Sequence, residues 1–133
     1  MSTGPPPSQL ILLSDLGSME KGTKVRFLGC VERYDDVASG VLLVKHAYPL
    51  GAPIQVAHVD VKLALETLRH TDLQTGAWLN ITGYVGEEAR RVRRQRGVCV
   101  QAVMVRPAGE LKLSEYEQAL DARKVCDILY QRA

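Results

Sequence analysis

Positive charge is concentrated in one short segment that lies between two glycines, Gly86 and Gly97. Five arginines occupy this segment: Arg90, Arg91, Arg93, Arg94 and Arg96. A guanidinium group is planar, donates paired hydrogen bonds to phosphate oxygens and can stack on nucleic-acid bases. The segment is therefore either a phosphate-binding loop or a solvated hairpin tip whose charge Glu87 and Glu88 partly neutralise, and both interpretations stay open.

A second candidate surface for nucleic acid combines polar and aromatic side chains on residues 78–85, which alternate as in a strand. Four side chains share one face of that strand: Trp78, Asn80, Thr82 and Tyr84. Arg26, on the outer face of an earlier strand, joins this candidate set. Exposed rings bind single strands by stacking, at about 1 to 3 kcal/mol per base. We favour the alternative that Trp78 is a buried corner and Tyr84 a rim residue, so binding by this chain alone should be weak.

The histidines and cysteines do not form a catalytic or metal-binding pattern. The histidines are His46, His58 and His70, and the cysteines are Cys30, Cys99 and Cys126. The histidines lie in separate predicted elements, and no cysteine has the close spacing of a zinc site. His58 and Asp60 share a strand face, but no serine or cysteine with an activating context accompanies them. We expect a protein that is not an enzyme and needs no metal or other cofactor.

The composition indicates one small domain inside the cell. The chain has 133 residues, which is enough for one hydrophobic core. Its formal net charge of +2 is too small for the molecule as a whole to attract a polyanion. No apolar run is long enough to span a membrane, and the start lacks the pattern of a signal peptide. We therefore expect no membrane partner. Residues 1–9 are rich in Pro, Ser and Gly and predict a flexible leader.

The elements that position these residues are predicted to be strands with one helix among them. Alternating apolar residues predict strands at 24–34, 41–48, 54–59, 78–85 and 98–106. A short helix over 61–69, capped by Asp60, lies between the third and fourth strands. Gly29 predicts a bulge or sharp bend in the long first strand. For residues 9–13 the sequence allows two alternatives, a strand or an extended segment that plugs one end of the barrel. This order is typical of a mostly β protein, a single five-stranded OB-fold barrel over residues 10–109.

Residues 110–133 are predicted to be a long C-terminal α-helix that binds a partner. A capping box from Ser114 to Glu117 marks its start. Its broad face and the polar residues that cross it form the candidate interface: Tyr116, Ala119, Leu120, Arg123, Cys126, Asp127, Leu129 and Tyr130. Because the barrel already has its own short helix, we favour a partner interface over packing of this helix on its own barrel.

Several segments, in this order, resemble a known family. They are GPPPS at 4–8, the apolar run at 10–16, GTKVRFLGCV at 22–31, VDVKLALETL at 59–68, LQTGAW at 73–78 and NITGYV at 80–85. Together they look like the fungal form of the Ten subunit, the small OB-fold member of the telomere-capping CST (Cdc-Stn-Ten) complex. The similarity extends over most of the chain, although the arginine segment is not part of it.

The resemblance implies a heterodimer with the N-terminal OB domain of the Stn subunit, made largely through C-terminal helices and adjoining barrel surface. It also implies assembly with the large CST subunit, protection of single-stranded telomeric DNA, and help to fill-in synthesis by the polymerase alpha-primase complex. The implied location is the nucleus, at chromosome telomeres. Two alternatives remain: a subunit like the small one of the replication protein A trimer, or a stand-alone single-strand binder that uses the arginine segment.

Overall fold

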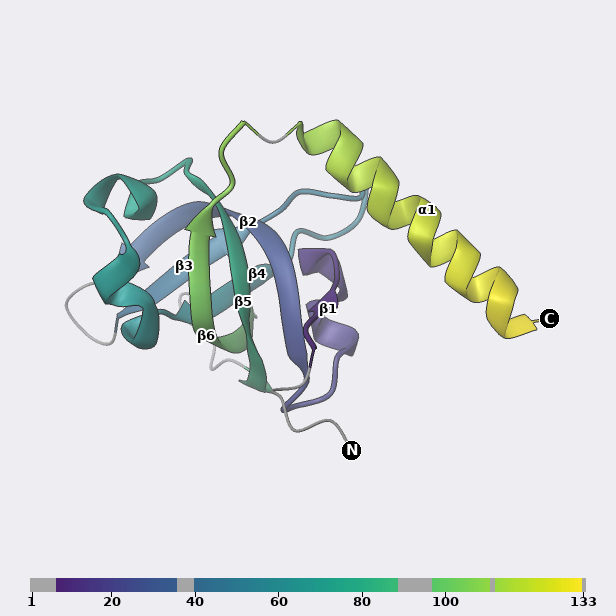
Figure 1. Ribbon diagram of the computed structural model, residues 1–133, viewed down its shortest axis with the longest axis horizontal. Coiled ribbons are helices and arrows are strands. Elements are labelled where there is room, and N and C mark those ends of the chain that lie inside the picture. The colour runs from purple at the N-terminus through teal and green to yellow at the C-terminus, as the bar shows by residue number, and fades with distance from the viewer. Residues whose placement is uncertain (1–6, 36–39, 89–96, 111, 133) are drawn as a thin grey trace.

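The chain folds as a closed barrel with a long helix at its C-terminal end (Figure 1). The computed structural model describes residues 7–35, 40–88, 97–110 and 112–132, with the backbone alone at 87–88 and 130–132. Its elements, in chain order, are β1 (Gln9–Leu10), η1 (Leu13–Ser18), β2 (Lys24–Asp35), β3 (Val41–Lys45), β4 (Val56–Asp60), η2 (Lys62–Thr67), η3 (His70–Leu73), β5 (Trp78–Glu88), β6 (Gly97–Pro107) and α1 (Leu113–Arg132).

The sheet has the strand order β1-β2-β3-β4-β6-β5, and an additional pairing of β2 with β5 closes it. The five strands from β2 to β6 therefore make the predicted OB-fold barrel, and β1 is a short parallel addition to β2. The core lines the inside of the barrel. Val25, Phe27 and Val31 of β2 are buried there as the alternation predicted.

Gly29 lies where β2 changes partners. Residues up to Cys30 pair with β5, and residues from Cys30 onward pair with β3. A Cβ at Gly29 would lie 2.9 Å from both Cβ and Cγ2 of Val44, so this crossing of strands requires a residue without a side chain. The interruption in the β2–β3 register falls between Val31 and Arg33, so the predicted bulge is not at Gly29 itself.

The short helix predicted over 61–69 is present as the 3-10 helix η2, and a second 3-10 helix, η3, follows it. Asp60 does accept the amide hydrogen of Lys62, at 3.0 Å. Three residues per turn place Val61 and Ala64 on the same side, where both are buried, and turn Leu65 outward. A 3-10 helix thus covers this part of the barrel with Val61 and Ala64.

The N-terminal segment combines the two alternatives that its sequence left open. Gln9 pairs with Val25 in β1, which places the last residue of the predicted leader inside the sheet. The 3-10 helix η1 follows, and Leu13 and Leu16 of η1 are fully buried in the barrel core. Residues 1–6 of the leader lie outside the described residues.

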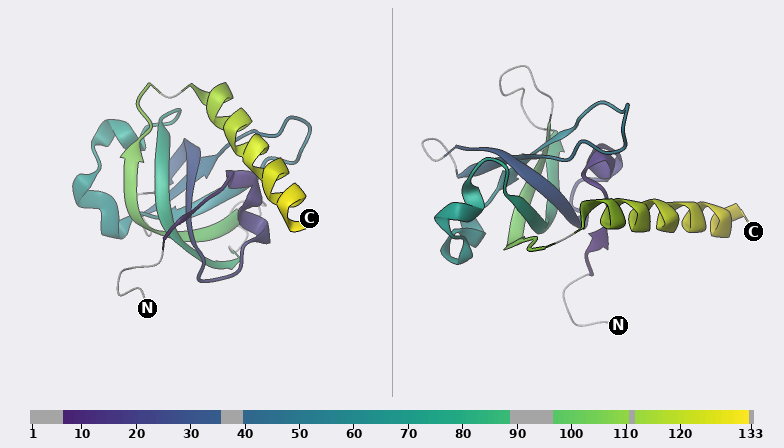
Figure 2. Two further views of the ribbon diagram at one scale, coloured as in Figure 1. Left: turned by 45° about the vertical axis from the view of Figure 1, so that its right-hand side comes forward. Right: turned by 90° about the horizontal axis from the view of Figure 1, so that it is seen from above.

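The helix α1 starts against the barrel and extends beyond it, as the view from above shows (Figure 2). It begins at Leu113, one residue before the predicted cap Ser114, and Glu117 directs its carboxylate to His46 instead of to the helix start. The predicted capping box is therefore wrong. In the described part of the chain, no helix has the length and apolar character needed to cross a membrane.

Candidate functional site

The first turns of α1 are packed on the barrel through an aromatic cluster at the end of β3. Leu120 is buried, and Tyr116 is half-buried beside it. The ring of His46, itself buried, lies 6.4 Å from that of Tyr116 and 5.3 Å from that of Trp78, which meets it edge-on. Burial raises the pKa of the Tyr116 hydroxyl, so this ring is a neutral part of the packing.

Three polar contacts from the barrel to α1 accompany this packing. His46 Nε2 lies 2.7 Å from Glu117 Oε2, the hydroxyl of Tyr48 donates to the Asp121 carboxylate, and Lys124 Nζ lies 2.8 Å from Asp15. A carboxylate only accepts, so His46 donates through Nε2. The hydrogen bond to Asp121 raises the pKa of Tyr48, because it favours the protonated hydroxyl.

The contacts made by Glu117, Asp121 and Lys124 fix which side of α1 faces the barrel. Their spacing of four and three residues places them along one side of a helix with 3.6 residues per turn. Val125, four residues after Asp121, and Leu129, four residues after Val125, lie beside this side of the helix and are 56% and 61% exposed. In the distal half of α1, which extends beyond the barrel (Figure 2), large apolar side chains therefore stay in contact with solvent.

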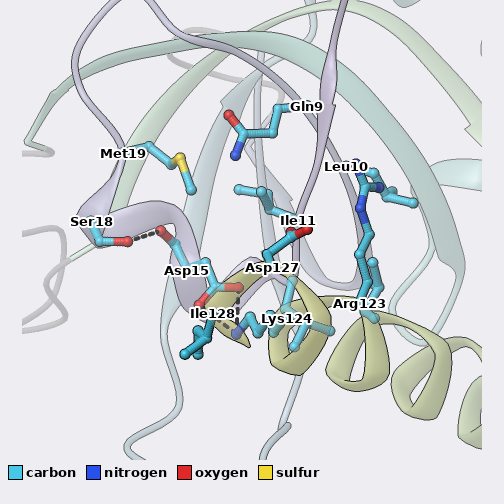
Figure 3. A pocket seen from close by; sticks show the side chains of 12 residues that line it. Gln9, Leu10, Ile11, Asp15, Ser18, Met19, Arg123, Lys124, Asp127 and Ile128 are labelled. Carbon is cyan, nitrogen blue, oxygen red and sulfur yellow. Dashed lines mark hydrogen bonds and ion pairs between the residues drawn. The ribbon is translucent and has the colours of Figure 1, made fainter. Parts of the chain in front are cut away.

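A cleft separates the distal half of α1 from the N-terminal segment (Figure 3). Its volume is about 540 Å³, and it is lined by residues of β1, η1 and α1. Arg123 and Asp127 of α1 line it together with Ile128, which is 52% exposed.

The predicted partner-binding residues divide into three groups. Tyr116 and Leu120 pack on the chain's own barrel, and Arg123 and Asp127 line the cleft. The remaining described members are exposed on α1: Ala119, Cys126 and Leu129. The side chain of Tyr130 lies outside the described residues. The sequence prediction missed His46, Tyr48 and Asp15, because their contacts span 71, 73 and 109 residues of chain and leave no periodic signal.

The predicted nucleic-acid-binding residues are not brought together as one site. Trp78 is half-buried against His46, so its ring is not a free stacking surface. Tyr84 is half-buried, with Lys24 Nζ 6.0 Å from the centre of its ring. Arg26 is exposed and pairs in register with Thr82. The other five lie outside the described residues: Arg90, Arg91, Arg93, Arg94 and Arg96.

Three further titratable groups lie on the barrel, away from α1. His58 is buried, and burial followed by the charge of Arg33 lowers its pKa from the ordinary value of 6.5. Burial raises the thiol pKa of both Cys30 and Cys99. These shifts favour the uncharged form of each group.

Comparison with known proteins gives consistent matches. Residues 1–121 match the family described as Ten1, telomere capping, CST complex subunit. The chain is 29% identical to protein ten1 of Schizosaccharomyces pombe over 121 residues, which are 90% of this chain and 97% of that protein. It is also similar to two crystal structures from fission yeast. One, of the Stn1-ten1 complex, has a TM-score of 0.68 and 27% identity, covering 94% of this chain and 99% of the other. The second, of Ten1, has a TM-score of 0.63 and 28% identity, covering 90% and 100%.

Proposed function

We propose, from the premise that this chain belongs to the Ten1 family of telomere-capping CST complex subunits, that the exposed half of α1 is its docking surface for an Stn1-type subunit. In this proposal the chain acts as one half of a heterodimer. It works in the nucleus at chromosome ends, as a binding subunit and not as an enzyme. The pairing supplies a second OB barrel next to this one.

The observation that supports this proposal is the exposure of large apolar side chains on the distal half of α1. Val125 and Leu129 are more than half exposed on a helix that extends beyond its own barrel (Figure 2). Burying a Val or Leu side chain in an interface contributes about 1.5 to 3 kcal/mol. Such a face is costly in an isolated protein and becomes favourable when a partner covers it.

The test is the affinity of the full chain for the N-terminal OB domain of its Stn1-type partner, measured by isothermal titration calorimetry. The double variant Val125→Ser with Leu129→Ser should weaken pairing by at least about 2 kcal/mol, or roughly thirtyfold. Leu63→Ser is the matched control, because Leu63 is 67% exposed on η2, across the barrel from α1 (Figure 1). Equal affinity of the double variant and the control would refute the docking surface.

The role in DNA protection follows from the same pairing. The described outer face offers few free rings, since Trp78 packs against His46. We propose that the chain binds single-stranded telomeric DNA weakly alone and better as a heterodimer, because two adjoining grooves raise the effective concentration of the strand. Together with the large CST subunit, the pair would protect the strand and help fill-in synthesis by polymerase alpha-primase. Nanomolar binding of a telomeric oligonucleotide by the lone chain, measured by fluorescence anisotropy, would contradict this role.

A further inference from the structure

Two hydrogen bonds connect the segment that follows β3 to the side of α1 that faces the barrel. His46 and Tyr48 are two residues apart, and their partners Glu117 and Asp121 are one helical turn apart on α1. The two hydrogen bonds are therefore parallel connections between one short barrel segment and one side of the helix. Lys124 adds a third connection, to Asp15 in η1, farther along the same side. Three contacts from two separate barrel segments restrict both the tilt and the rotation of a helix.

We propose that His46 and Tyr48 are positioning residues, which fix the angle at which α1 presents its exposed apolar face to the partner. This inference rests on the proposed function of that face. Neither residue needs to touch the partner. They act by holding Glu117 and Asp121, so that Val125 and Leu129 are already oriented when the partner arrives. A preorganised surface loses less conformational entropy on binding, and its affinity is higher for that reason.

The burial of the contacts indicates which of them control the angle. The side chains of His46 and Glu117 are 2% and 15% exposed, so water competes little for their hydrogen bond. Those of Lys124 and Asp15 are 44% and 24% exposed, and a pair of this kind is weakened by solvent and salt. The bond at His46 is therefore a stronger restraint than the distal ion pair. Among the described residues, His46 Nδ1 has no hydrogen-bond partner, so the hydrogen bond of the ring is the one from Nε2 to Glu117.

A short connection joins β6 to the helix that these contacts restrain. Between β6, which ends at Pro107, and the start of α1 at Leu113, the chain contains Gly109 at a φ of 67°. The described backbone hydrogen bonds there join Ala108 to Trp78 and Tyr116 to Lys112. Without His46 and Tyr48, the helix would keep the packing of Leu120 and Tyr116 and the more exposed Lys124–Asp15 ion pair, which restrain its direction less.

The experiment measures the direction of α1 directly, in the full chain without partner. One spin label is placed on native Cys126, which is exposed on α1, and one on Leu63→Cys across the barrel. The background replaces the other two cysteines with alanine. Electron paramagnetic resonance then gives the distribution of label distances. In His46→Phe with Tyr48→Phe, which keep the rings and remove both hydrogen bonds, this distribution should widen at least twofold.

Controls separate positioning from general stability. His46→Gln keeps an amide donor for Glu117 and should restore most of the narrow distribution, which a loss of stability would not allow. Tyr34→Phe removes a hydroxyl from a half-buried ring on β2 and should change nothing. Affinity for the Stn1-type domain should fall about two- to twelvefold for each hydrogen bond removed. An unchanged distance distribution in the double variant would overturn the proposal. A widened distribution with unchanged affinity would show that the two hydrogen bonds hold the helix direction, and it would refute the proposal that the exposed apolar face of α1 is the docking surface.

Discussion

The close approach of Gly29 in β2 to Val44 in β3 predicts that Gly29→Ala destabilises the barrel. The new Cβ would lie 2.9 Å from both Cβ and Cγ2 of Val44 and 3.4 Å from Cδ1 of Leu13. Val44 is buried and belongs to a central strand, so it cannot turn away without moving backbone. Overpacking of this kind costs about 1 to 3 kcal/mol. Alanine also restricts the unfolded chain, which returns about 0.4 to 1 kcal/mol. The expected result is therefore a net loss of up to about 2.6 kcal/mol.

Gly17→Ala is the matched control for this prediction. Its Cβ would lie 2.8 Å from Nε2 of Gln55, a contact as short as the one at Gly29. The obstacle here is the end of a flexible side chain, which can rotate away at a cost of about 0.5 kcal/mol or a little more. The gain from the unfolded state offsets that cost. We expect Gly17→Ala to leave stability unchanged within about 0.5 kcal/mol.

Urea unfolding followed by circular dichroism distinguishes the two variants. The gain from the unfolded state is common to both variants, so they differ by about 0.5 to 2.5 kcal/mol of packing cost. With a slope of about 2 kcal/mol per molar urea, this difference separates the two midpoints by about 0.25 to 1.25 M. The slope itself should not change, since both variants bury the same surface. If Gly29→Ala and Gly17→Ala unfold at the same midpoint, the close approach of β2 to Val44 does not determine the residue at position 29.

Three further predictions concern charge and reactivity. Lowering the pH through 6.5 should reduce the free energy of unfolding, because burial and Arg33 lower the pKa of His58, which therefore takes up a proton more readily when unfolded. In urea titrations at several pH values, His58→Gln should flatten this dependence, whereas His70→Gln should not. Iodoacetamide at pH 8 should modify exposed Cys126 first, since burial raises the pKa of the other two thiols, and mass spectrometry of digests identifies the site. Serine at all five arginines of 90–96 should flatten the salt dependence of DNA binding by the heterodimer, with a change of about 0.7 in slope for each lost phosphate contact; an unchanged slope would identify a solvated tip.

The sequence was sufficient for the barrel because each strand carries its own signal. Alternation in β2, β5 and β6 identifies their inner faces, and the order of strands and short helix restricts the topology to one common fold. Strand ends were less predictable. Residues 46–48 continue the alternating pattern of β3, but the ladder stops at Lys45, and His46 and Tyr48 contact α1 instead. A pattern of period two cannot distinguish pairing with a strand from packing against a helix.

The candidate site was only partly predictable for a related reason. The periodicity of α1 identifies a broad apolar face, yet it does not divide that face between the barrel and a partner. The division depends on which polar residues find a complement, and Glu117 and Asp121 find theirs in His46 and Tyr48. Those pairs are separated by more than 70 residues of chain. Without related sequences or coordinates, nothing local to either residue indicates the other.

The division of α1 explains how one helix can be part of the barrel and also available to a partner. Leu120 and Glu117 belong to the barrel side, and their burial and hydrogen bonding do not depend on a second subunit. Val125 and Leu129 make no equivalent contribution to the isolated chain, because each stays more than half exposed. Burying the exposed parts of both would contribute about 2 to 3.5 kcal/mol before the costs of association. The barrel side therefore sets the direction of the helix, and the distal half sets the affinity for the partner. Substitutions on the barrel side should affect pairing through the conformation of the free chain. Substitutions in the distal half should affect it through contacts in the complex.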